Sequence, residues 1–185
     1  MSLVQLSPPA GEPIPLAELK AHLRVTQTAE DALVAGLGLA ARQAIEARFG
    51  LAILPQAWRL RLDVASCAVV ELPLSPVASV DAVTGYRPDG GGEALSADAF
   101  AASAGHVGRV RIDVAGALRA PFDAIAIDFT AGWPDAASAP QEILLAIKAL
   151  AAHFYENREA AGTDRFHTSP ESLNALMAPW RRVRL

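Results

Sequence analysis

The spacing of apolar residues along the chain changes twice and divides the sequence into parts. Residues 16–49 repeat apolar side chains at intervals of three and four, as helices do. Residues 55–132 alternate apolar and polar side chains, as half-buried strands do. The helical spacing returns at residue 141. The pattern predicts an α+β protein: a helical core of two N-terminal helices and one long later helix, an inserted small antiparallel β module, and an extended C-terminal tail.

Residues 1–54 are expected to hold an N-terminal arm and the first helices of the core. The arm, residues 1–13, is rich in proline and glycine. Pro15 then suits the first turn of a helix over LAELKAHLRV. A second helix is predicted from about residue 29 to residue 49.

The second helix has a start signal, a stop signal and two internal glycines. Thr28 is the predicted N-cap, and Gly50 is predicted to end the helix. Gly36 and Gly38 each cost about 1 kcal/mol against alanine, so either the helix bends there or a neighbouring backbone packs closely. The predicted buried stripe is Leu33, Leu37, Ala41, Ala44 and Ile45.

The β module, residues 55–132, is expected to contain four or five short strands. AWRLRLDV, GRVRIDVAG and DAIAIDFTAG alternate clearly, and VVELPLSPVASVDAV holds two further candidates. RPDGGGE, residues 87–93, predicts a turn, and ADAFAAS a short helical turn or an irregular segment. Short strands at this spacing indicate an antiparallel sheet or a sandwich.

Residues 133–162 predict a linker and the long helix that completes the core. GWPDAASAP leads to Pro140, and a helix is expected from residue 141 to about 161, ended by Gly162. Its predicted buried stripe is Ile143, Leu144, Ile147, Ala151 and Phe154. Residues 163–185 form the expected tail.

The composition of the chain argues against several classes of protein. The net charge is −4, which argues against a chain that grips DNA phosphates. Cys67 is the single cysteine, so no intrachain disulfide is expected, and the protein fits a reducing cytoplasm. No apolar run reaches the roughly 20 residues of a membrane span, and the N-terminus lacks the pattern of a secretory signal. The basic run WRRVRL is either a solvated tail or a docking tail for an acidic partner; charge alone favours the former.

The residues best suited to chemistry lie in AAHFYENREA, residues 151–160. His153 and Glu156 have the spacing of carboxylate-bridged metal helices, but no second pair of this kind exists, so no metal site is expected. The chain has no G-x-S-x-G, Cys67 lies in apolar company, and RPDGGGE lacks the order of a phosphate loop. We therefore expect no enzyme and no cofactor.

A second face of the same helix carries Tyr155, Arg158 and Glu159. Tyr155 neighbours Glu159 at i,i+4 and Arg158 at i,i+3. Tyrosine and arginine are frequent in protein interfaces, so this face is either an interface or a solvated surface with one tyrosine. The residues alone leave both interpretations open.

Several segments together resemble one protein family. They are LAELKAHLRV with the acidic pair of AEDALVAGL, AGWPDAASAPQEILLAIKALAAHFYENREA, and LNALMAPWRRVRL. In these segments the chain resembles the head–tail connector (adaptor) proteins of long-tailed phages, prophages and gene transfer agents. The resemblance covers nearly the whole length, although Trp180 stands where tyrosine is common.

The resemblance implies a structural subunit of a ring, usually of twelve copies, beneath the portal protein. Such a ring extends the DNA channel, supports the stopper or tail-completion protein, and lets double-stranded DNA pass without specific binding. The implied portal-binding tail is Leu173, Leu176, Met177, Trp180, Arg181, Arg182 and Arg184. The implied core and subunit interface is His153, Tyr155, Glu156, Asn157 and Arg158. No membrane partner is implied.

The implied location is the neck of a virion or phage-like particle, with assembly in the cytoplasm of the bacterial host. Two alternatives remain. One is another assembly part, such as a stopper, or a ligand-binding β module. The other, less favoured, is an acid–base enzyme that uses His153 and Glu156.

Overall fold

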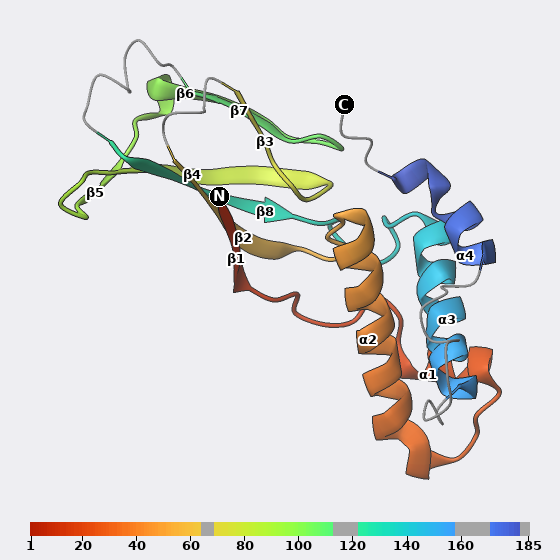
Figure 1. The fold of residues 1–185 in the computed structure, drawn as a ribbon. Helices are drawn as coiled ribbons and strands as arrows, with labels where there is room; N and C mark the ends of the chain where they lie inside the picture. The colour runs from red at the N-terminus through yellow and green to blue at the C-terminus, as the bar shows by residue number, and fades with distance from the viewer. Residues whose placement is uncertain (64–68, 113–121, 158–170, 182–185) are drawn as a thin grey trace. The chain divides into compact units, whose positions relative to one another are not determined.

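The computed structural model combines helices with antiparallel sheets (Figure 1). It describes residues 1–63, 69–112, 122–157 and 171–181. Within these ranges, each helix is too short or too polar to cross a membrane. The mixed composition confirms the predicted α+β class.

The chain forms two compact units, each built from two separate stretches of sequence. The β unit comprises Met1–Gly11 and Ala52–Pro134. The helical unit comprises Glu12–Leu51 and Asp135–Leu185. In sequence order, the second stretch of the β unit therefore lies between the two stretches of the helical unit.

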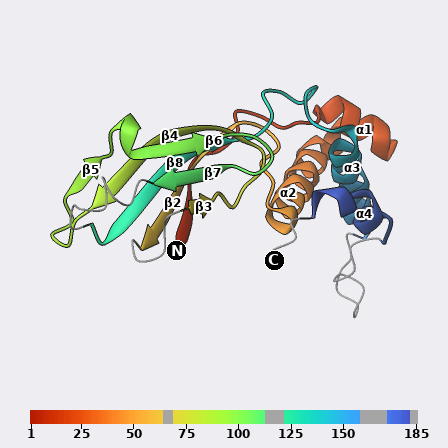
Figure 2. The same ribbon diagram turned by 90° about the horizontal axis from the view of Figure 1, so that it is seen from above.

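The β unit is a sandwich of two antiparallel sheets around one core (Figures 1 and 2). The larger sheet has the order β1-β2-β8-β4-β5 and the smaller sheet β3-β7-β6. Both sheets contribute to the core, for example through Leu60, Ile127 and Val110. The strands are β1 (Ser2–Ser7), β2 (Gln56–Asp63), β3 (Val69–Glu71), β4 (Val77–Tyr86), β5 (Gly92–Ala94), β6 (Phe100–Ser103), β7 (Arg109–Ile112) and β8 (Ala124–Ala131).

Two predictions for the strands need correction. The structure describes eight strands where four or five were expected, partly because ADAFAAS forms a 3₁₀ turn, η3 (Ala97–Ala99), followed by β6. The N-terminal arm was placed with the helical core in residues 1–54. Instead Ser2–Ser7 pairs with β2 at the edge of the larger sheet. Its partner strand lies some fifty residues later, so local sequence carried no signal for this pairing.

The helical unit is built around two long helices that pack against each other (Figure 1). Residues such as Val34 and Ile45 of α2, and Ile143 and Ile147 of α3, are almost fully buried. Shorter helices and turns complete the unit. The elements are α1 (Leu16–Leu23), η1 (Thr28–Glu30), α2 (Asp31–Phe49), α3 (Gln141–Glu156), α4 (Glu171–Leu176) and η5 (Ala178–Trp180).

The two ends of α2 match the predictions unequally. Gly50 ends the helix in the left-handed conformation, with φ of 64°, as predicted. The predicted N-cap, Thr28, instead begins η1, and Glu30 takes the N-cap position without a side-chain capping bond. The additional 3₁₀ turn therefore moves the start of the helix by two residues.

The buried stripe of α2 was predicted only in part. Ala41 and Ile45 are buried as expected, but Leu33 is 40% exposed. Ala44 is also exposed, and Leu37 is half-buried. The helix is rotated from the predicted orientation so that Arg42 and Glu46 face the interior, a choice that its hydrophobic pattern did not reveal.

The long helix α3 starts directly after Pro140, as predicted, and Asn157 is its C-cap. Four residues of the predicted stripe are buried, whereas Phe154 is half-buried. The predicted last turn, residues 158–161, and Gly162 lie outside the described residues. The linker before α3 begins at Gly132, which has φ of 127°.

Replacing Gly132 with alanine should lower the free energy of unfolding by about 1–3 kcal/mol. A Cβ atom there would stand 2.3 Å from the carbonyl oxygen of Leu54, and the backbone has a positive φ. Denaturant unfolding measures the loss. Gly11→Ala is the matched control, because no atom lies within 4 Å of its added Cβ. Equal stability of the two variants would contradict this account.

Candidate functional site

The C-terminal end of α3 carries the motif with the most chemical potential, and Tyr155 is bonded within the helical unit. Its hydroxyl donates a hydrogen bond to Glu30 Oε2 at 2.6 Å. Glu30 stands at the start of α2, so the bond connects the end of one long helix to the beginning of the other. Tyr155 is half-buried, and its first role is structural.

His153 and Asn157 form the local ending of α3. Asn157 Nδ2 donates to the carbonyl oxygen of His153 at 2.8 Å and lies 3.2 Å from His153 Nδ1. The backbone amide of Asn157 donates to the same carbonyl at 3.1 Å, so the side chain adds a second bond to a carbonyl of the last helical turn. Glu156 is exposed to solvent. Arg158 and Glu159, the other polar residues of the motif, lie outside the described residues.

The described surroundings of this motif were compared with the needs of a metal site and of acid–base chemistry. Among the described residues, no three histidine, cysteine, aspartate or glutamate side chains are grouped so that they could hold a metal ion. An apolar hollow of about 270 Å³ lies in the helical unit, lined by residues such as Ile14, Leu19 and Leu39. Glu12, the titratable residue of its lining, is engaged with Arg42. The hollow is suited to apolar contact, not to acid–base chemistry.

The predicted portal-binding tail is divided between buried and exposed residues. Leu173 and Met177 are 3% and 0% exposed, and α4 packs against α3. Leu176 and Trp180 are half-buried, and Arg181 is exposed. Arg182 and Arg184 lie outside the described residues. The first part of the tail is thus folded onto its own unit.

A charge cluster that the sequence did not predict lies in the helical unit, with Arg42 and Glu46 buried and Glu12 at the surface. Arg42 is 5% exposed; its Nη1 donates to Glu46 Oε2 at 2.5 Å and its Nε to Glu12 Oε2 at 2.8 Å. Burial alone would lower the pKa of Arg42, but the bonds and charges of Glu12 and Glu46 outweigh it and raise the pKa. The i,i+4 spacing of Arg42 and Glu46 was a visible signal, although Glu12 was not.

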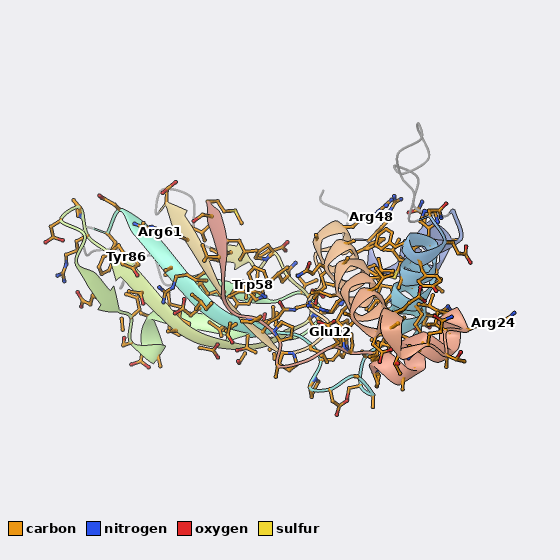
Figure 3. The ribbon with its side chains drawn as sticks, turned by 90° about the horizontal axis from the view of Figure 1, so that it is seen from below. Glu12, Arg24, Arg48, Trp58, Arg61 and Tyr86 are labelled. Atoms are coloured by element: carbon orange, nitrogen blue, oxygen red, sulfur yellow. The ribbon has the colours of Figure 1, made fainter. Side chains whose placement is uncertain are left out.

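The larger sheet presents a second charged surface. Arg59 on β2 makes two hydrogen bonds to its cross-strand partner Asp128, at 2.6 and 2.7 Å. These bonds raise the pKa of Arg59. Arg61 lies over the ring of Tyr86, with 4.9 Å between guanidinium carbon and ring centroid (Figure 3). These contacts stabilise a polar face of the larger sheet.

The residues of the linker motif are fixed by backbone bonds. In the β unit, the amide of Trp133 donates to the carbonyl oxygen of Ile53 at 3.3 Å. In the helical unit, the Ser138 amide donates to Asp135 Oδ1 at 2.7 Å. Hydrogen bonding by Ser138 lowers the pKa of Asp135. Trp133 is therefore fixed within the β unit and Asp135 within the helical unit.

Tyr155→Phe should lower the free energy of unfolding by about 1–2 kcal/mol, because a half-buried hydrogen bond to a carboxylate is lost. Thermal or denaturant unfolding of the unassembled chain gives the value. Tyr86→Phe is the control, because it also removes one hydroxyl from a half-buried tyrosine but lies in the β unit. An unchanged stability of Tyr155→Phe would show that the bond to Glu30 contributes nothing.

Comparison with known proteins yields matches among solved structures alone. No family model matches the chain, and no curated protein matches it. One similar structure is described as the neck of an empty GTA particle computed with C6 symmetry. Its chain is 29% identical, with a TM-score of 0.80, and the match covers 100% of this chain and 97% of that one.

Two further structures agree. A chain in the virion of a native gene transfer agent (GTA) particle is 29% identical, with a TM-score of 0.80. A chain in the neck of a native GTA particle, computed with C12 symmetry, is 27% identical, with a TM-score of 0.79. Both matches cover 100% of this chain and 97% of the other. Over its full length, the chain is therefore similar to components of the gene transfer agent neck and virion.

Proposed function

We propose that this chain is a structural head–tail connector (adaptor) subunit in the neck of a phage-like or gene transfer agent particle. The observation that carries the proposal is the full-length similarity to neck chains, which extends over both units. A shared sandwich alone would reflect a common fold. Similarity that also includes the interrupted helical unit supports a common structural role.

In this proposal, about twelve copies form a ring beneath the portal protein and support the stopper or tail-completion protein. The sixfold and twelvefold symmetries of the similar necks support this arrangement. Assembly takes place in the host cytoplasm, and the mature location is the particle neck. No catalytic step is required, in keeping with the bonded positions of His153 and Tyr155.

The ring would let DNA pass without binding it specifically. Twelve copies carry a formal charge of about −48, which is twelve times the −4 of one chain. Carboxylates on the channel wall would repel the DNA phosphates and keep the duplex from adhering. Arg59 is paired with Asp128, which reduces the positive charge that this residue could offer to DNA.

Deletion of the gene provides the direct test. Cells without this chain should accumulate heads that lack tails, and a plasmid copy should restore tailed particles. Electron microscopy of purified particles distinguishes the two products, and a tag on the restored chain should be found at the neck. Normal numbers of tailed particles without the chain would refute the proposed function.

The C-terminal tail is the proposed contact with the portal protein. Trp180, Arg181, Arg182 and Arg184 provide an aromatic residue followed by cations, a common composition of binding hot spots. Leu176, four residues before Trp180, belongs to the same proposed contact. Leu173 and Met177, which are buried, would hold the base of this tail on α3.

Changing Arg181, Arg182 and Arg184 together to glutamate should weaken portal binding at least tenfold, because three cations become anions. Binding to purified portal protein can be measured by interferometry. The control changes Arg61, Arg87 and Arg111, which are exposed on the β unit, to glutamate with the same change in net charge. If both variants bind the portal protein equally weakly, overall charge explains the loss, and the tail is not the portal contact.

A further inference from the structure

We propose that the outward face of α2 binds the outward face of α3 in an adjacent copy of this chain. The inference rests on the proposed ring and identifies the surfaces through which its subunits meet. The α2 face consists of Ala32, Leu33, Ala35, Gly36, Leu39, Ala40, Gln43, Ala44 and Ala47, and the α3 face of Leu145, Ala149 and Ala152.

The α2 face is uncharged and, apart from Gln43, apolar, the reverse of a solvated helix surface. Between Asp31 and Arg48 the helix has two charged residues, Arg42 and Glu46, and both are buried. The members of the α2 face are all exposed. A surface helix normally turns its charged residues to water and its apolar residues to the core. In this helix those two charged residues are buried instead, and the exposed face is largely apolar.

The exposed large apolar side chains of the helical unit lie on these same two faces. Within the described part of the helical unit, three such side chains are exposed: Leu33 by 40%, Leu39 by 38% and Leu145 by 46%. Two belong to the α2 face and one to the α3 face. On the α3 face, Ala149 follows Leu145 by one helical turn, and it is also exposed.

Gly36 is the feature that the fold of one chain does not explain. Apart from the neighbouring residues of its own helix, a Cβ atom at Gly36 would have no atom of the described residues within 4 Å, whereas at Gly38 it would stand 2.7 Å from Leu19 Cδ2. Packing against α1 thus accounts for Gly38 alone. Glycine is unfavourable inside a helix compared with alanine, so a benefit from outside the chain is needed at Gly36.

The residues around Gly36 leave a gap on the surface of α2 into which an apolar side chain of another copy can insert. Leu33 and Leu39 precede and follow Gly36 by three residues, so the three lie in a row on the same side of α2. Without a Cβ atom, Gly36 leaves a gap between the two leucines. The apolar hollow of the helical unit begins beside the same row, because Ala35 and Leu39 line it. Leu145 of an adjacent copy has the size and exposure to enter this gap.

A closed ring accounts for two different faces on one subunit. Each member of a ring must present two complementary surfaces, one to each neighbour. Because α2 and α3 pack against each other through their buried stripes, we infer that their exposed faces point away from one another. Both faces are apolar at their centres, so neither leaves an unpaired charge buried when they meet.

Gly36→Ala should have opposite effects on the subunit and on the ring. The melting temperature of the unassembled chain should rise by about 2–4 °C, because alanine favours the helix. Native mass spectrometry, alone and with portal protein, should show at least tenfold weaker assembly. Gly38→Ala is the matched control and should not raise the melting temperature, since Leu19 must move. Unchanged assembly of Gly36→Ala would refute the gap as a contact.

Mixing two blocked variants tests the pairing of unlike faces. Ala40→Glu places a charge on the α2 face, and Leu145→Glu places one on the α3 face. Each variant alone should remain monomeric, but an equimolar mixture should form dimers, since one intact face of each kind remains. Ala21→Glu, at an exposed position of α1, should assemble like the original chain. Circular dichroism verifies that all variants are folded.

The outcomes separate the two proposals. If the original chain assembles and both blocked variants assemble equally well, this inference is wrong and the proposed connector function stands. Monomers in the mixture of the blocked variants would also overturn the pairing of unlike faces. If the original chain stays monomeric with and without portal protein, the proposed function fails, and the inference fails with it.

Discussion

The packing of α2 against α3 is the interaction on which the helical unit depends. The chain leaves this unit after Leu51 and returns at Asp135, so its two halves are joined in sequence only through the whole β unit. Their buried apolar stripes must hold them together. Polar bonds reinforce the junction: Tyr155 donates to Glu30, and Lys148 pairs with Glu18 at 2.9 Å. Such partly exposed bonds contribute little individually, so the apolar contact dominates.

This requirement gives a structural role to polar residues of AAHFYENREA that the structure describes. Tyr155 connects the two halves of the unit, and Asn157 caps the helix over His153. The remaining surface is then available for assembly. The cluster of Arg42 with Glu12 and Glu46 acts in the same direction, because it removes the charges from the outer face of α2. The same ion pairs thus balance the charges on the inward side of α2 and leave its outer face uncharged.

The sequence predicted those elements whose signals are local. Alternation identified β2, Gly50 ended α2, and Pro140 preceded α3. Features that depend on distant partners were missed. β1 becomes a strand through pairing with β2. Arg42 is buried with an ion-pair partner, Glu12, that lies thirty residues earlier in the sequence. The orientation of α2 was ambiguous because the helix has apolar residues around its whole circumference. For that reason Leu33, which is exposed, was assigned to the core.

The native mass of the full chain, measured alone and with the portal protein of its particle, tests the central claim most directly. One chain has a mass of 19.4 kDa, so twelve copies would weigh roughly 230 kDa. The account predicts this mass, either free or added to the portal assembly. A mass of one chain under both conditions, at concentrations up to tens of micromolar, would contradict it.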